Sequence, residues 1–134
     1  MKTALKIAAI LMLLHTIGHT IGAITWKKAP NPAIQKIVDD MQSNHFNFMG
    51  RSVSLGLFFE GYGFTMIGVL LLLTIMLWLQ PERKFILTIG LFLLFMGIIE
   101  LIYFFPFAAA FTLVAAIATL YAFVKGKPLA NITS

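Results

Sequence analysis

Four long apolar stretches, separated by short polar segments, dominate this 134-residue chain. Each is close to or longer than the roughly 20 residues that an α-helix needs to cross a lipid bilayer. The pattern predicts membrane-spanning helices at about 4–25, 53–79, 85–105 and 107–124. We expect them to form one transmembrane domain over residues 1–134, with an all-α fold of the integral membrane four-helix bundle type.

The polar segment between the first two spans contains a shorter periodic pattern. Asn31 and Pro32 suit the N-cap and the first position of a helix. Apolar residues then recur at helical spacing, at Ile34, Ile37, Val38 and Met41. Because the opposite face is polar and charged, a short amphipathic helix at about 32–43 is expected to lie on the membrane surface. The next residues, including His45, are expected to be an ordinary polar connection.

Composition supports the membrane class. Hydrophobic residues make up 60% of the chain and charged residues only 11%, too few for a soluble domain of this size. The net charge of +5 sits in flanks and loops, where it meets lipid headgroups, so no nucleic-acid partner is expected. The chain has no cysteine, which excludes disulfides, iron–sulfur clusters and thiolate zinc.

Basic residues also predict the orientation. The start of the chain resembles a signal peptide, but its apolar run continues past His15 to Ile24, so we expect a retained first helix. Four crossings place both termini on one side. That side carries Lys2, Lys6, Arg83, Lys84, Lys125 and Lys127. Both termini are therefore expected in the cytoplasm, with the protein integral to the inner or plasma membrane.

Four ionisable residues inside the spans are the candidate site. His15 and His19 are one helical turn apart, so both rings leave the same side of the first helix, together with Gly18 and Gly22. Glu60 and Glu100 lie within the second and third spans. Helical rise places the four residues roughly 8 to 14 Å below the outer face. Small residues on the same sides favour close helix packing there.

A buried carboxylate needs neutralisation, because an acid at a helix centre costs about 2.5 to 3.5 kcal/mol on insertion scales. Imidazolium, a bound cation or a proton would each provide it. We therefore expect His15, His19, Glu60 and Glu100 to share one outward-opening site. They would bind a divalent metal (zinc, iron or manganese) or act as catalytic acid and base on a lipophilic small molecule. Tyr62, Tyr103 and Asn47 are candidate rim residues.

Two other functions stay open at this point. The same residues could line a proton or ion path, although the inner half of the spans has no ionisable residue to continue one. They could also only fix helix pairing in a structural or assembly subunit. Membrane lipid and a lipophilic small molecule are the expected partners. The sequence leaves open whether the chain is an enzyme and whether it forms a homo-oligomer.

Overall fold

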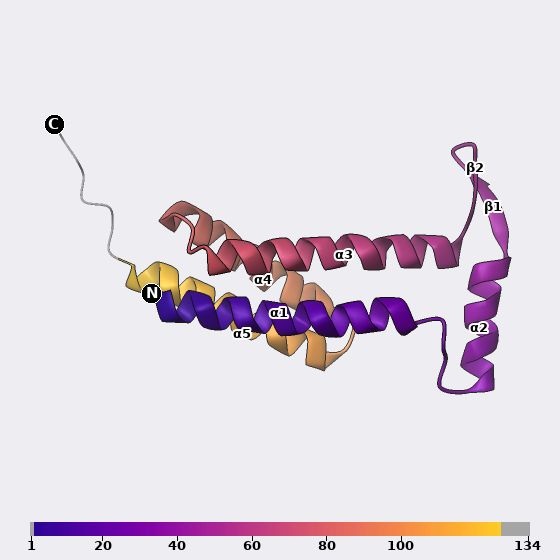
Figure 1. The fold of residues 1–134 in the computed structure, drawn as a ribbon, viewed down its shortest axis with the longest axis horizontal. Helices are drawn as coiled ribbons and strands as arrows, with labels where there is room; N and C mark the ends of the chain where they lie inside the picture. The colour runs from indigo at the N-terminus through magenta and orange to yellow at the C-terminus, as the bar shows by residue number, and fades with distance from the viewer. Residues whose placement is uncertain (1, 127–134) are drawn as a thin grey trace. The chain divides into compact units, whose positions relative to one another are not determined.

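The computed structural model describes residues 2–126 and contains helices together with one short β-hairpin (Figure 1). In chain order the elements are α1 (Lys2–Thr25), α2 (Pro32–Ser43), β1 (His45–Phe48), β2 (Arg51–Ser54), α3 (Leu55–Trp78), α4 (Arg83–Tyr103) and α5 (Pro106–Lys125). Helices α1, α3, α4 and α5 are long and apolar enough to cross a membrane. The five predicted helices are thus confirmed, with ends that differ by two residues at most.

The chain divides into two compact units. Unit 1 comprises Met1–His15 and Leu70–Ser134, and unit 2 comprises Thr16–Val69. Helices α1 and α3 run through both units, so each contributes one part to unit 1 and one part to unit 2. The predicted single transmembrane domain is not tested by this division and stays a prediction.

Helices α4 and α5 form an antiparallel pair in unit 1. Gly90 early in α4 faces Leu120 late in α5, and Gly97 late in α4 faces Leu113 early in α5. A Cβ atom added at Gly97 would lie 2.6 Å from Cδ2 of Leu113, so a larger residue here would require Leu113 to move. The opposing side of α5 buries small residues, namely Ala109, Thr112, Ala115, Ala116, Thr119 and Ala122. This pair is the close-packed part of unit 1.

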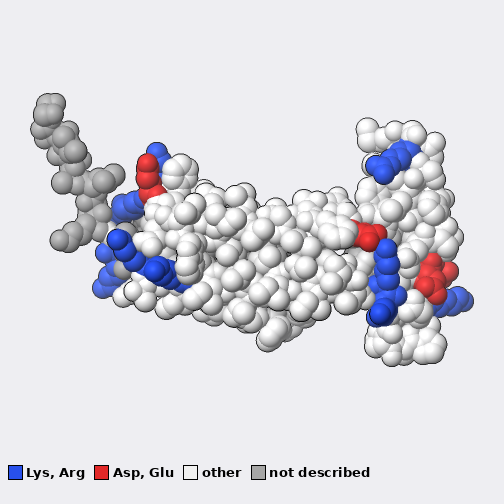
Figure 2. Space-filling view, viewed as in Figure 1, with Lys and Arg blue, Asp and Glu red and all other residues white. Residues whose placement is uncertain are grey.

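Basic side chains gather at one end of unit 1, as Figure 2 shows in blue. Nζ of Lys6 in α1 lies 5.7 Å from the ring centroid of Trp78, the last residue of α3. Cζ of Arg83, the first residue of α4, lies 4.1 Å from the ring centroid of Phe123 near the end of α5. The start of α1 and the end of α5 therefore share this end. Its side of the membrane stays a prediction.

In unit 2, α2 begins at a well-formed cap. The Asn31 side chain accepts a hydrogen bond of 3.0 Å from the Ile34 backbone N–H, and Pro32 occupies the first turn. Both features match the prediction from the sequence. Figure 1 shows α2 lying across the ends of the α1 and α3 segments of this unit. Val38 is the buried residue of the helix.

The β-hairpin corrects the expectation of an irregular connection. Strands β1 and β2 pair antiparallel in a register that runs from His45–Ser54 to Phe48–Arg51. Met49 and Gly50 form the turn, with φ values of 52° and 81°. Two positive φ values in a two-residue loop are typical of a type I′ turn, whose twist matches that of the strands. The hairpin occupies residues that were expected to begin the second span, so α3 begins only at Leu55.

Candidate functional site

Three helices bring His15, Glu100 and Thr112 together in unit 1. Nδ1 of His15 lies 2.9 Å from the hydroxyl oxygen of Thr112, within hydrogen-bonding distance. Nε2 of the same ring lies 3.8 Å from Oε1 of Glu100. The side chains of His15 and Glu100 are 8% and 12% exposed, and Thr112 is fully buried. An imidazole, a carboxyl group and a hydroxyl group thus share one buried location, called here the His15 cluster.

The positions of these residues in their helices explain the arrangement. Thr112 belongs to the buried small-residue side of α5, which leaves room for a ring beside it. Glu100 lies in the last turn of α4, where its carbonyl accepts the N–H of Phe104. It is three residues from Tyr103, or about 4.5 Å along the axis, and so is nearer the helix end than expected. Its carboxyl group is nevertheless turned toward α1 and α5.

One oxygen of the His15 cluster has no hydrogen bond. Oε2 of Glu100 is buried and finds no partner among the residues that the structure describes. A buried acceptor left unpaired typically costs about 1 to 3 kcal/mol. Oε1 faces the imidazole, and Thr112 also neighbours this carboxyl group. Oε2 of Glu100 is therefore a buried acceptor for which the described residues provide no hydrogen-bond donor.

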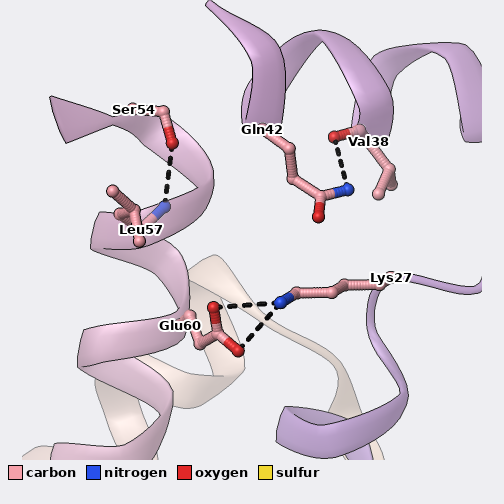
Figure 3. Close-up of polar contacts among 6 residues, drawn as sticks. All are labelled: Lys27, Val38, Gln42, Ser54, Leu57 and Glu60. Atoms are coloured by element: carbon pink, nitrogen blue, oxygen red, sulfur yellow. Dashed lines mark hydrogen bonds and ion pairs between the residues drawn. The ribbon is translucent and has the colours of Figure 1, made fainter. Parts of the chain in front are cut away.

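Glu60 takes a different partner, in unit 2. Nζ of Lys27 lies 3.0 Å from Oε1 and 3.1 Å from Oε2 of Glu60 (Figure 3). The Lys27 side chain is 46% exposed and that of Glu60 is 30% exposed. Lysine was not among the neutralising groups expected from the sequence. Because α3 begins at Leu55, Glu60 lies only five residues, or about 7.5 Å, into the helix.

The Lys27–Glu60 ion pair forms one wall of a small pocket. The pocket has a volume of about 160 Å³ and is lined by Lys27, Gln42, His45, Ser54, Gly56, Leu57 and Glu60. In Figure 3, Ser54, just before α3, accepts a hydrogen bond from the Leu57 N–H, and Gln42 of α2 donates one to the Val38 carbonyl. His45, which was expected to be an ordinary loop residue, is part of this lining.

His19 binds the backbone of α3 within unit 2. Its Nε2 lies 3.2 Å from the carbonyl oxygen of Gly63, which fixes the ring against the neighbouring helix. A Cβ atom at Gly63 would lie 3.3 Å from that of Ala23, so α1 and α3 approach closely here. At Gly18 and Gly22, by contrast, a Cβ atom would have open space among the described residues. The close contact expected at these two glycines is therefore found at Gly63.

Each of the four expected site residues has a polar contact within its own unit. His15 meets Glu100, Glu60 meets Lys27, and His19 meets a backbone carbonyl. Across residues 2–126, no three His, Cys, Asp or Glu side chains are grouped so that they could hold a metal ion. The metal prediction therefore has no support in this part of the chain, and a site shared by all four residues stays a prediction. The rim role of Tyr62, Tyr103 and Asn47 is likewise untested.

The fold and these contacts define a class: a small helical protein with four helices that are long and apolar enough to cross a membrane. Comparisons with known protein families, with curated proteins and with solved structures find no match to this chain. Its function must therefore be argued from its own residues.

Proposed function

We propose that this chain is an integral membrane protein that binds a lipophilic small molecule at the His15 cluster, through a hydrogen-bond donor on that molecule. The observation that carries the proposal is the buried, unpaired Oε2 of Glu100. A ligand N–H or O–H would satisfy this oxygen, and in a site with little water such a bond is stronger than at the surface. A protonated amine would also provide the countercharge that a buried carboxylate needs.

Aromatic residues beside Glu100 suit a lipophilic ligand. Tyr103 and Phe104 follow Glu100 at three and four residues, so they lie on its side of α4 or just past the helix end. Both are largely exposed, at 73% and 66%. Further on, the rings of Phe107 and Phe111 are in edge contact, with centroids 5.1 Å apart. Aromatic faces of this kind attract both apolar groups and organic cations.

His15 gives the site acid–base capacity. In the tautomer whose Nδ1 accepts the Thr112 O–H, the proton of a neutral ring is on Nε2, the nitrogen that faces Glu100. A proton arriving on Glu100 from a ligand could then be shared with the imidazole, which is the arrangement that general acid–base chemistry requires. A divalent ion is the alternative occupant. It would need a ligand beyond His15 and Glu100, and metal analysis of the purified protein tests it.

The test uses full-length protein in lipid nanodiscs and a long-chain alkyl amine that carries a photoreactive diazirine. We expect the probe to label residues near the α4–α5 connection. Glu100→Gln should lower this labelling about tenfold, because it removes a charge-assisted hydrogen bond worth about 1.5 to 3 kcal/mol. Glu82→Gln, on an exposed acid at the opposite end of α4, is the matched control. Thermal unfolding of each variant checks folding, and Glu100→Asp keeps the charge.

Labelling that is equal in the wild type and in a folded Glu100→Gln variant would refute the proposal. A second candidate function would then gain weight: a structural subunit whose polar groups only pair helices. The specific observation in its favour is that His19 and Glu60 are already bound to groups of their own chain, Gly63 and Lys27. For that function, the variants should change stability and leave labelling unaltered.

A further inference from the structure

The β-hairpin has two chemically different faces, since neighbouring residues of a strand point to opposite sides. The polar face carries His45, Asn47, Ser52 and Ser54. The other face carries Phe46, Phe48, Arg51 and Val53. A two-stranded hairpin of this size is marginally stable in water and needs packing against another surface. Its aromatic face is the one available for such packing.

Helix α3 covers only part of this aromatic face. The ring centroid of Phe58 lies 6.2 Å from that of Phe46 and 5.5 Å from that of Phe48. Even so, Phe46 remains 42% exposed and Phe48 remains 50% exposed. Within the described residues, contact with Phe58 therefore leaves about half of each ring open.

The tip of the hairpin is apolar and unprotected. Met49 is 93% exposed, the highest value among the large hydrophobic residues of the described chain. Its φ of 52° lies in the left-handed region, which asparagine and glycine adopt more readily than methionine. Turn geometry therefore does not explain a methionine here. A large apolar side chain at a strained, exposed position indicates a contact outside the chain.

We infer that the hairpin inserts its tip and its aromatic face into the headgroup layer of an anionic lipid bilayer. Aromatic rings beside basic residues are typical of the membrane interface. In unit 2, Trp26 packs on Phe59 with centroids 4.9 Å apart, as an interfacial pair would. Apart from Lys27, which is paired with Glu60, the connecting segment 26–54 carries three basic residues, Lys28, Lys36 and Arg51, against Asp39 and Asp40. Its charge therefore complements anionic headgroups. Figure 1 shows the hairpin between the end of α2 and the start of α3.

This inference rests on the proposed membrane insertion and is independent of ligand binding at the His15 cluster. Because the chain has no cysteine, single cysteines can carry a spin label without other changes. Met49→Cys reports on the tip and Ser52→Cys on the polar face of the same hairpin. Leu91→Cys, at an exposed position within α4, is the reference for a residue inside the bilayer.

The labelled full-length proteins are placed in nanodiscs of phosphatidylglycerol or phosphatidylcholine, and collisions with oxygen and with a water-soluble nickel complex are measured. We expect the label at 49 to collide with oxygen but to be shielded from nickel, and this shielding should be stronger in phosphatidylglycerol than in phosphatidylcholine. The label at 52 should remain accessible to nickel. Equal nickel access at 49 and 52, with the label at 91 shielded, would overturn the hairpin inference but not the proposed membrane insertion. Nickel access at 91 would overturn membrane insertion itself. Spin–spin broadening at 49 would indicate a second copy as the occupant and would also overturn the inference.

Discussion

Nζ of Lys27 lies about equally far from both carboxylate oxygens of Glu60, so a residue just after α1 neutralises an acid within α3. The separation in sequence is 33 residues, and the segment enclosed holds α2 and the β-hairpin. The carboxylate of Glu60 thus has a countercharge within an apolar helix, and that countercharge is a lysine ammonium group.

The Lys27–Glu60 pair should show a small favourable coupling in a double-mutant cycle with Lys27→Met and Glu60→Gln. Both side chains are partly exposed, so water screens the pair, and about 0.5 to 1 kcal/mol is expected. The measurement is the free energy of unfolding of the four proteins in detergent micelles. The pair Lys84–Glu82, with both side chains over 70% exposed, is the control and should show no measurable coupling. Equal coupling in both cycles would contradict the prediction.

Thr112→Val should destabilise the protein by about 1 to 3 kcal/mol, because it leaves Nδ1 of His15 without its hydroxyl partner in a buried location. Thr112→Ser should retain most of the stability. Thr119→Val is the matched control, since within residues 2–126 the hydroxyl of this equally buried residue donates only to the Ala115 carbonyl of its own helix. Unfolding followed by circular dichroism provides the values. A larger loss for Thr119→Val than for Thr112→Val would refute the assigned role.

Gly97→Ala should weaken the α4–α5 pair by about 1 to 3 kcal/mol. The new methyl group would lie 2.6 Å from Cδ2 and 2.7 Å from Cγ of Leu113, so this leucine must move. Gly61→Ala is the control, because a Cβ atom there meets nothing within 4 Å in the described structure, and alanine favours the helix. Thermal unfolding compares the two variants. If Gly97→Ala unfolds no earlier than Gly61→Ala, the packing assigned to this pair is incorrect.

Asn31→Ala should loosen the first turn of α2, because it removes the acceptor for the Ile34 N–H. Loss of such a cap costs about 1 kcal/mol, and Asn31→Asp should restore it. Hydrogen exchange resolved by residue in nanodiscs measures the effect. Amides near the start of α2 should exchange several times faster in the alanine variant, with those of α4 unchanged. Uniform acceleration throughout the chain would indicate global destabilisation instead.

The helices could be predicted from the sequence because the signals are long and local. Twenty apolar residues in a row, or Asn31 followed by Pro32 and a helical repeat, define an element without any knowledge of the rest of the chain. The hairpin was missed for the opposite reason. Each strand has four residues, and the turn is Met49–Gly50, where an Asn–Gly or Asp–Gly pair would have been the recognisable signal. The alternation of polar residues with phenylalanine from His45 to Phe48 was the available clue.

The candidate site could be predicted only in part. Depth along the helices predicted His15 and Glu100 in the same half of the spans, and the structure places Nε2 of His15 3.8 Å from Oε1 of Glu100. Depth along a helix does not predict which side chain of a connection turns back toward that helix, and so the partner of Glu60, Lys27, was not predicted. The hairpin also shifted the start of α3, which placed Glu60 within reach of that lysine. Contacts of this kind depend on the course of the segments that connect the helices, and the hydrophobic periodicity of the helices does not determine that course.

The ion pair at the base of the segment between α1 and α3 also bears on how this protein can vary. The Lys27–Glu60 ion pair holds the two ends of this loop together. Such a loop can be lengthened at small entropic cost, because the entropy of loop closure grows only with the logarithm of the loop length. The segment that contains α2 and the hairpin can therefore be extended at positions that contact neither Phe58 nor Gly56 of α3, provided that Lys27 and Glu60 are kept. A change in this segment would then leave the close approach of α1 and α3 at Gly63 in place.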